Sequence, residues 1–113
     1  MSNHIDIYGY VSYQPEMVLI KVAGEEVPKV VFQMLDRTAN FQKKEPMFVE
    51  VQYMKDNAAN IFPYLQKGKE IFVMGHLDHK TYVTSKNETK DKYYIMADVI
   101  TLCGKKDNED AEQ

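Results

Sequence analysis

Apolar and polar side chains alternate along several short stretches of this chain, and glycine, proline or asparagine residues separate the stretches. Residues 5–13 alternate until Pro15 ends the run, and residues 18–22 and 27–35 are rich in β-branched side chains. A period of two is typical of strands with one buried face. The three stretches therefore predict strands, and the second and third predict a hairpin. Gly9, inside the first run, predicts a bend or bulge, as small barrels require.

The second half of the chain continues this pattern. After a polar loop, residues 46–54 alternate and predict another strand. Residues 70–77 and 93–102 predict two more, and residues 80–84 prolong the former toward a polar tip at 85–88. Together these segments predict a long β-hairpin. The fold class is therefore mostly β.

Residues 56–68 are the one stretch with near-helical spacing of apolar side chains. Pro63 lies inside it, and a proline in a helix interior costs about 3 kcal/mol. A proline in the first turn is tolerated. We therefore predict a short helix over residues 61–67, with Asn60 as its N-cap and Gly68 as its C-terminal stop.

Length and composition fit one small globular domain. The chain has 113 residues and 13.2 kDa, with 44% hydrophobic and 27% charged residues and a mean hydropathy of −0.48. We expect one folded domain at residues 1–104 and a short, acidic, disordered tail at 105–113. The N-terminal residues do not resemble a signal peptide, no stretch reaches the ~18 apolar residues of a membrane span, and there is one cysteine. We expect a cytoplasmic protein with no membrane partner.

The net charge of −3, from 14 basic and 17 acidic residues, argues against a strongly basic nucleic-acid binder. The predicted tail carries two lysines and four acidic residues, which leaves 12 basic against 13 acidic residues in the rest of the chain. A domain with a net charge of −1 must concentrate its lysines locally if it binds phosphate.

Candidate catalytic chemistry is sparse. His76 and His79 form an H-x-x-H pattern, but that spacing on a strand places the two imidazoles on opposite faces, so they cannot share a metal without a bulge. Cys103 follows an apolar strand, which predicts a buried, unreactive thiol. Neither a nucleophile elbow nor a phosphate-binding loop is present in the sequence. We predict no catalytic residue, no metal and no cofactor, and a small hydrolase is the most distant alternative.

Large apolar side chains interrupt the polar face of one predicted strand. On residues 46–54 the polar positions, marked by Glu50 and Gln52, also include Phe48 and Met54. Such side chains can stack on unpaired bases, each contact contributing about 1–3 kcal/mol. They can equally lie beneath a loop or in an oligomer interface.

The predicted long hairpin interleaves lysines with tyrosines. This mixture supplies both phosphate neutralisation and base stacking, as single-strand binders require, although an ordinary solvated loop has a similar composition. The candidate contact residues on the hairpin are Lys80, Tyr82, Lys86, Lys90, Lys92 and Tyr94.

Several short motifs, taken in order, resemble one protein family. The motifs are Gly9 with Pro15-Glu16, residues 48–53, Ala58-Ala59, Tyr64-Leu65-Gln66-Lys67-Gly68, and the Gly75-His76-Leu77 that closes residues 70–77. Over residues 3–104 their order and spacing are similar to those of bacterial single-stranded DNA-binding proteins. The resemblance implies a five-stranded oligonucleotide-binding (OB-fold) barrel with one short helix between strands 3 and 4.

The resemblance also implies contact residues. Phe48 and Tyr82 stand at tryptophan positions of the family, and Met54 stands where a base-stacking phenylalanine is common. Thr38 replaces a usual aromatic residue and Glu50 replaces a common basic one, which shifts the expected contacts toward other residues. Those additional candidates are Tyr53, Phe41, Arg37 and Lys43.

In that family single-stranded DNA wraps around an oligomer, usually a tetramer, and an acidic tail docks replication or repair proteins through a Pro-Phe tip. This chain ends Asp110-Ala111-Glu112-Gln113 and lacks that docking motif. We predict a homotetramer or homodimer that binds single-stranded DNA without strong sequence preference and protects unwound strands during replication, recombination or repair, without catalysis.

Two alternatives share the predicted fold. One is a primosomal accessory, similar to primosomal replication protein N, that docks a helicase. The lack of tryptophan favours this alternative, and the predicted helix between strands 3 and 4 argues against it. The other is a protein-interaction barrel without DNA binding, which the net charge of −3 favours.

Overall fold

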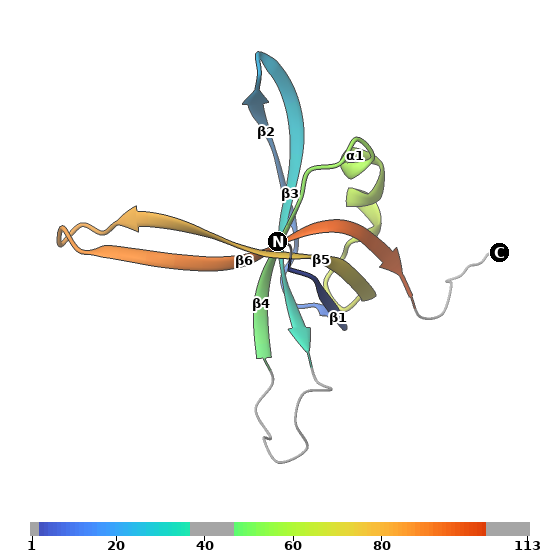
Figure 1. Cartoon of the computed structure of the whole chain (residues 1–113). Helices are drawn as coiled ribbons and strands as arrows, with labels where there is room; N and C mark the ends of the chain where they lie inside the picture. Colours follow the sequence, from blue (N-terminus) through green and yellow to red (C-terminus); the bar gives the residue numbers. More distant parts are fainter. Residues whose placement is uncertain (1–2, 37–46, 104–113) are drawn as a thin grey trace.

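The computed structural model describes residues 3–36 and 47–103 of the chain. Strands predominate in it, and a short helical segment separates the fourth strand from the fifth (Figure 1). The elements are β1 (Ile5–Val11), β2 (Glu16–Val22), β3 (Glu25–Asp36), β4 (Met47–Tyr53), α1 (Ala58–Ile61), the 3-10 turn η1 (Phe62–Tyr64), β5 (Glu70–Val83) and β6 (Thr89–Leu102). Arg37, Thr38, Phe41, Lys43 and the predicted acidic tail lie outside the described residues.

Five of these strands close into a ring. Around it, β1 pairs with β5, β5 with β6, β6 with β4 and β4 with β3, and a short contact between Tyr10 of β1 and Leu35 of β3 completes the circle. All pairings are antiparallel except β4–β6, which aligns Val51 with Ile95. In the described part of the chain, β2 pairs only with β3 and lies outside the ring. The expected five-stranded barrel is confirmed, with the helical segment between its third and fourth strands, β4 and β5.

Alternate side chains of the ring strands point into the barrel and form its core. Ala58 and Leu65, from the segment between β4 and β5, add two fully buried side chains. Full burial of a large aliphatic side chain contributes about 1.5–3 kcal/mol, so the inward positions hold the ring together. The core comprises Val11, Val30, Phe32, Met34, Val51, Tyr53, Ala58, Leu65, Ile71, Val73, Ile95, Ala97 and Ile100.

The helical segment begins earlier than the sequence predicts. Its N-cap is Asn57, not Asn60, and α1 ends at Ile61 before η1 continues as a 3-10 turn. Pro63 explains why α1 ends at Ile61, because proline has no N–H to donate to the carbonyl of residue 59 and the α-helical hydrogen bonding cannot pass through it. The tighter turn then closes with the Leu65 N–H donating to the Phe62 carbonyl at 3.1 Å.

Two glycines allow close approach of neighbouring strands. A Cβ on Gly9 would lie 2.2 Å from the Leu35 carbonyl oxygen, at the point where β1 passes from β5 to β3. The β1–β5 pairing keeps its register through Gly9. The bulge lies instead on β6, where Asp98 is the extra residue between Ala97 and Val99, the partners of Gly75 and Met74 on β5. A Cβ on Gly75 would lie 2.3 Å from the Met96 carbonyl oxygen. Both positions therefore require glycine for steric reasons.

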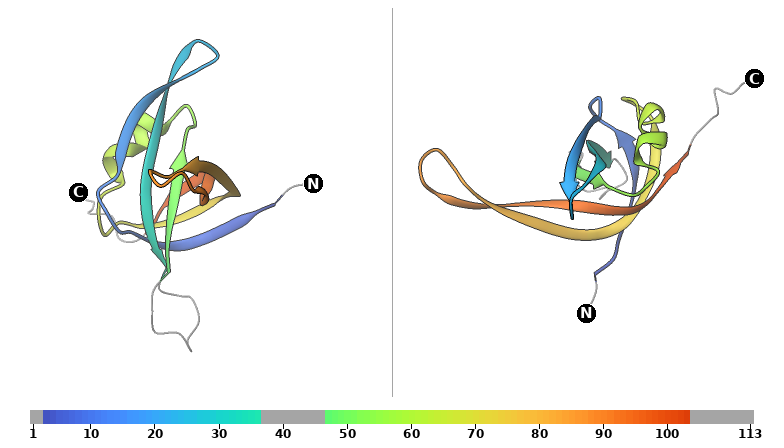
Figure 2. Two further views of the ribbon diagram at one scale, coloured as in Figure 1. Left: turned by 90° about the vertical axis from the view of Figure 1, so that its left-hand side faces the viewer. Right: turned by 90° about the horizontal axis from the view of Figure 1, so that it is seen from above.

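Two hairpins project from the barrel in different directions (Figure 2). The β5–β6 hairpin, built from the two longest strands, forms a long arm, and the β2–β3 hairpin forms a second projection (Figure 1). The predicted polar tip of the β5–β6 hairpin is confirmed as a turn, which is closed by the Thr84 N–H donating to the Glu88 carbonyl. No helix in the described residues is long and apolar enough to cross a membrane.

Candidate nucleic-acid interface

The strand register gathers most of the predicted contact residues on one surface of the barrel. Val51 and Tyr53 of β4 point inward, so Phe48, Glu50 and Gln52 point outward. β4 lies between β3 and β6, and β5 lies beyond β6, so their outward side chains form a continuous surface, here called the outer sheet face. It comprises Lys29, Val31, Gln33 and Leu35 of β3; Phe48, Glu50 and Gln52 of β4 with the following Met54; Lys90, Lys92, Tyr94 and Met96 of β6; and Asp78, Lys80 and Tyr82 of β5.

The outer sheet face carries accessible aromatic rings. The side chain of Phe48 is 52% exposed and that of Tyr82 is 43% exposed, and Met54 and Tyr94 are partly exposed. Accessible rings on a sheet offer flat surfaces on which bases can stack. Lys86 lies outside the strands, in the exposed turn at the hairpin tip.

Among the predicted contact residues that the structure describes, Tyr53 alone is buried. It points into the barrel, its side chain is 4% exposed, and its hydroxyl donates to Asn57 Oδ1. The reason is its parity, because Tyr53 shares the inward side of β4 with Val51. The sequence names Tyr53 as a candidate contact residue, but its buried ring is not part of the outer sheet face.

An ion pair neutralises Glu50, one of the two acidic residues on the outer sheet face as defined above. Lys92 Nζ lies 2.8 Å from Glu50 Oε1, and Gln52 Nε2 donates to Glu50 Oε2 at 2.9 Å. Partial burial alone would raise the pKa of Glu50, but the hydrogen bonds and positive charge of Lys92 and the Gln52 amide lower it below its ordinary value. The same contact with Glu50 raises the pKa of Lys92. Both groups therefore remain charged near neutral pH, and Lys92 is occupied by Glu50.

The other lysines of this region are more available. Lys90 Nζ lies 3.9 Å from Glu88 Oε1, and both side chains are more than half exposed, so the pair contributes little. Lys80 and Lys86 are exposed and make no ion pair with any described residue. The ammonium groups of these three lysines can therefore contact phosphate groups of a nucleic acid without first breaking a strong ion pair.

Tyr94 is held by a neighbouring strand. Partial burial raises its pKa, and the negative charges of Asp78 and Glu50 and a hydrogen bond with Asp78 raise it further. Asp78 faces Tyr94 across the β5–β6 pairing. The phenol therefore keeps its proton near neutral pH, and Asp78 is placed to accept a hydrogen bond from it.

The residues considered for catalysis do not converge. His76 and His79 lie on opposite faces of β5, with His76 Nδ1 3.8 Å from Asp98 Oδ2 and the His79 ring 5.7 Å from that of Tyr93. No three His, Cys, Asp or Glu side chains in residues 3–36 and 47–103 are placed to hold a metal ion. Cys103 is partly exposed and not buried as predicted, because it follows the end of β6.

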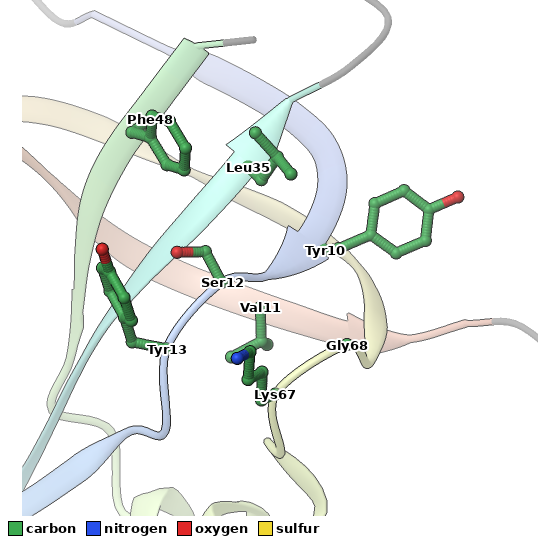
Figure 3. Close-up of a pocket in the computed structure, with 8 residues that line it drawn as sticks. All are labelled: Tyr10, Val11, Ser12, Tyr13, Leu35, Phe48, Lys67 and Gly68. Atoms are coloured by element: carbon green, nitrogen blue, oxygen red, sulfur yellow. The ribbon is translucent and has the colours of Figure 1, made fainter.

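The sequence did not single out a pocket that adjoins Phe48. Its volume is about 550 Å³, and Figure 3 shows the residues that line it around the end of β1. They are Tyr10, Val11, Ser12, Tyr13, Leu35, Phe48, Lys67 and Gly68. No local pattern could have revealed it, because four separate segments of the chain line it.

A comparison with protein families agrees with this geometry. The model of the single-strand binding protein family matches residues 2–103. The chain belongs to this family. A single-stranded DNA-binding protein of Onion yellows phytoplasma (strain OY-M), also similar to this chain, is 26% identical over 106 residues, which cover 94% of this chain and 98% of that protein.

Solved structures of single-strand binding proteins have a similar fold. A Plasmodium falciparum SSB in complex with single-stranded DNA superposes with a TM-score of 0.71 at 20% identity, over 92% of this chain and 96% of that one. A small single-stranded DNA-binding protein from Streptomyces coelicolor gives a TM-score of 0.67 at 21% identity, over 91% and 95%. The barrel seen here is therefore the OB fold of the single-strand binding family, as the sequence motifs predicted.

Proposed function

We propose that this protein binds single-stranded DNA along the outer sheet face, without strong sequence preference and without catalysis. The supporting observation is the placement of accessible Phe48 and Tyr82 rings on the same face as Lys80 and Lys90. Rings stack on any base and lysines neutralise any phosphate, so this combination favours single strands without reading sequence. In the cell such binding would protect unwound strands during replication, recombination or repair.

The experiment is a titration of the whole protein with a labelled single-stranded oligonucleotide at several salt concentrations, with duplex DNA as control. Each phosphate contact to a single strand adds about −0.7 to the slope of log affinity against log salt. Contacts from Lys80, Lys86 and Lys90 predict a slope of about −2. Preference for single strands with such a slope would support the proposal. Absence of binding at low salt would refute it and favour a protein-interaction barrel.

A primosomal accessory protein of the same fold remains the weaker alternative. The segment formed by α1 and η1 lies between β4 and β5. A helical segment at this position is the feature that argues for a single-strand binder and against the primosomal accessory. Tight binding of a helicase without binding of single-stranded DNA would favour the primosomal accessory over the single-strand binder.

We also propose that the protein forms a homo-oligomer, a dimer or a tetramer, through unpaired strand edges. The support lies on β2, which pairs on one side only among the described residues and exposes Met17, Val18, Leu19 and Val22. Exposed apolar edge strands tend to pair with another chain.

Replacing Leu19, which is 62% exposed, by lysine should therefore lower the mass measured by light scattering. The matched control is Tyr64→Lys, because Tyr64 is 61% exposed but lies on η1. A monomeric wild-type protein, or a Leu19→Lys variant of unchanged mass, would contradict this edge.

A further inference from the structure

The pocket beside Phe48 has an apolar floor and an accessible aromatic wall. Val11 is 1% exposed and Leu35 is partly buried, while Tyr13 is 63% exposed. In Figure 3 the Tyr13 ring reaches from the segment between β1 and β2 toward Phe48, whereas Tyr10 points away from both. Two accessible rings above an apolar floor form a site for a flat, partly apolar group.

Polar groups around this floor restrict the choice of ligand. Lys67 is exposed and makes no ion pair with any residue that the structure describes. The Ser12 hydroxyl donates to Gln33 Oε1 at 2.9 Å, which leaves its lone pairs free to accept a hydrogen bond. A purely apolar ligand would leave the ammonium group of Lys67 without an anion. A nucleotide combines the required features, since its base is flat, carries hydrogen-bond donors and is joined to a phosphate.

Backbone hydrogen bonds hold the pocket in place without a ligand. The Gly68 N–H donates to the Val11 carbonyl at 2.8 Å, and the Val11 N–H donates to the Lys69 carbonyl at 2.9 Å. The Ser12 N–H donates to the Gln33 carbonyl at 2.7 Å. These bonds hold the backbone of residues 67–68 beside the end of β1, so ligand binding does not have to order the backbone of the site.

The pocket is continuous with the outer sheet face. Phe48 belongs to both, and Leu35, which lines the pocket, pairs with Phe48 across β3 and β4. A strand that stacks on Phe48 can therefore continue into the pocket, and no acidic side chain of residues 3–36 and 47–103 lines it.

We propose that this pocket binds one nucleotide of the bound single strand, with the base against Tyr13 and Phe48 and a phosphate at Lys67. The inference rests on the proposed function and extends it to residues from β1, its following segment and the turn before β5. The footprint on one protomer then runs from the hairpin arm across β4 to the end of β1.

The test measures oligothymidylate binding by the full chain and by the variants Tyr13→Ala and Lys67→Ala. We expect Tyr13→Ala to weaken binding about fivefold or more, as loss of one stacked base does. Lys67→Ala should make the salt slope less steep by about 0.7, as loss of one phosphate contact does. An oligonucleotide that carries 5-iodouracil should cross-link to Tyr13 on irradiation, as mapped by mass spectrometry.

The controls match each variant in exposure and chemistry. Tyr64→Ala removes an equally exposed ring from η1, and Lys21→Ala removes an exposed lysine from β2, and neither residue lines the pocket. Unchanged binding and salt slope in Tyr13→Ala and Lys67→Ala, with a wild-type protein that binds, would overturn the pocket alone. A wild-type protein that does not bind single strands would overturn the proposed function as well.

Discussion

Replacing both Phe48 and Tyr82 by alanine should lower the affinity for single-stranded DNA by about 30-fold or more. Each ring is about half exposed on the outer sheet face, and each lost base stack costs about 1–3 kcal/mol. The fold should remain intact, because neither side chain belongs to the core. The measurement is a fluorescence titration with oligothymidylate, with thermal unfolding followed by circular dichroism as the check on folding.

Two features of this result would separate stacking from a general loss of binding. The salt slope should not change, because the substitutions remove no charge. The control pair Tyr64→Ala and Tyr93→Ala should bind normally, since both rings are about 60% exposed but lie away from the outer sheet face. Unchanged affinity in the Phe48→Ala and Tyr82→Ala double variant would refute the assignment of the binding surface.

The outer sheet face was largely predictable because side chains alternate along a strand with a period of two. Once Val51 is inward, Phe48 and Glu50 must point outward, and the sequence alone showed this parity. The same rule places Tyr53 inward, so its selection as a contact residue contradicted the pattern on its own strand. The alternation along one strand fixes which face each side chain occupies, and it can be read from the sequence wherever the strand has no bulge.

Contacts between distant segments could not be predicted in the same way. Glu50 and Lys92 meet because β4 and β6 pair in parallel, and that pairing follows from closure of the ring. Tyr13 and Lys67 line the same pocket because the Gly68 N–H bonds to the Val11 carbonyl at the end of β1. The helix start was also misjudged, because Pro63 fits the second position of a 3-10 turn that follows a complete α-helical turn. In the first two cases the contact depends on pairing between segments that are far apart in the sequence.

Glu50→Gln should raise the affinity for single-stranded DNA about tenfold at low salt, equivalent to about 1.4 kcal/mol. In the wild-type protein Glu50 holds Lys92 at 2.8 Å and places a negative charge among groups proposed to face phosphates. Glutamine removes that charge and releases Lys92, so the salt slope should become steeper by about 0.7. The Lys92 side chain is about half exposed, so loss of the pair should change the free energy of unfolding by less than about 1 kcal/mol.

A double-mutant cycle tests whether Glu50 and Lys92 act on the bound strand as a pair of opposite charges. Lys92→Gln should weaken binding because it leaves Glu50 uncompensated on the face, and the variant with both substitutions should bind as the wild type does, since both remove opposite charges. The pKa of Glu50 is lowered, so its charge is lost only below the ordinary carboxyl range, and the gain in Glu50→Gln should be equal at about pH 6 and pH 8. Unchanged affinity and salt slope in Glu50→Gln would mean that the strand does not pass Lys92. The bound path would then run from Phe48 toward the pocket and away from the hairpin arm, which the Tyr82 substitution would report independently.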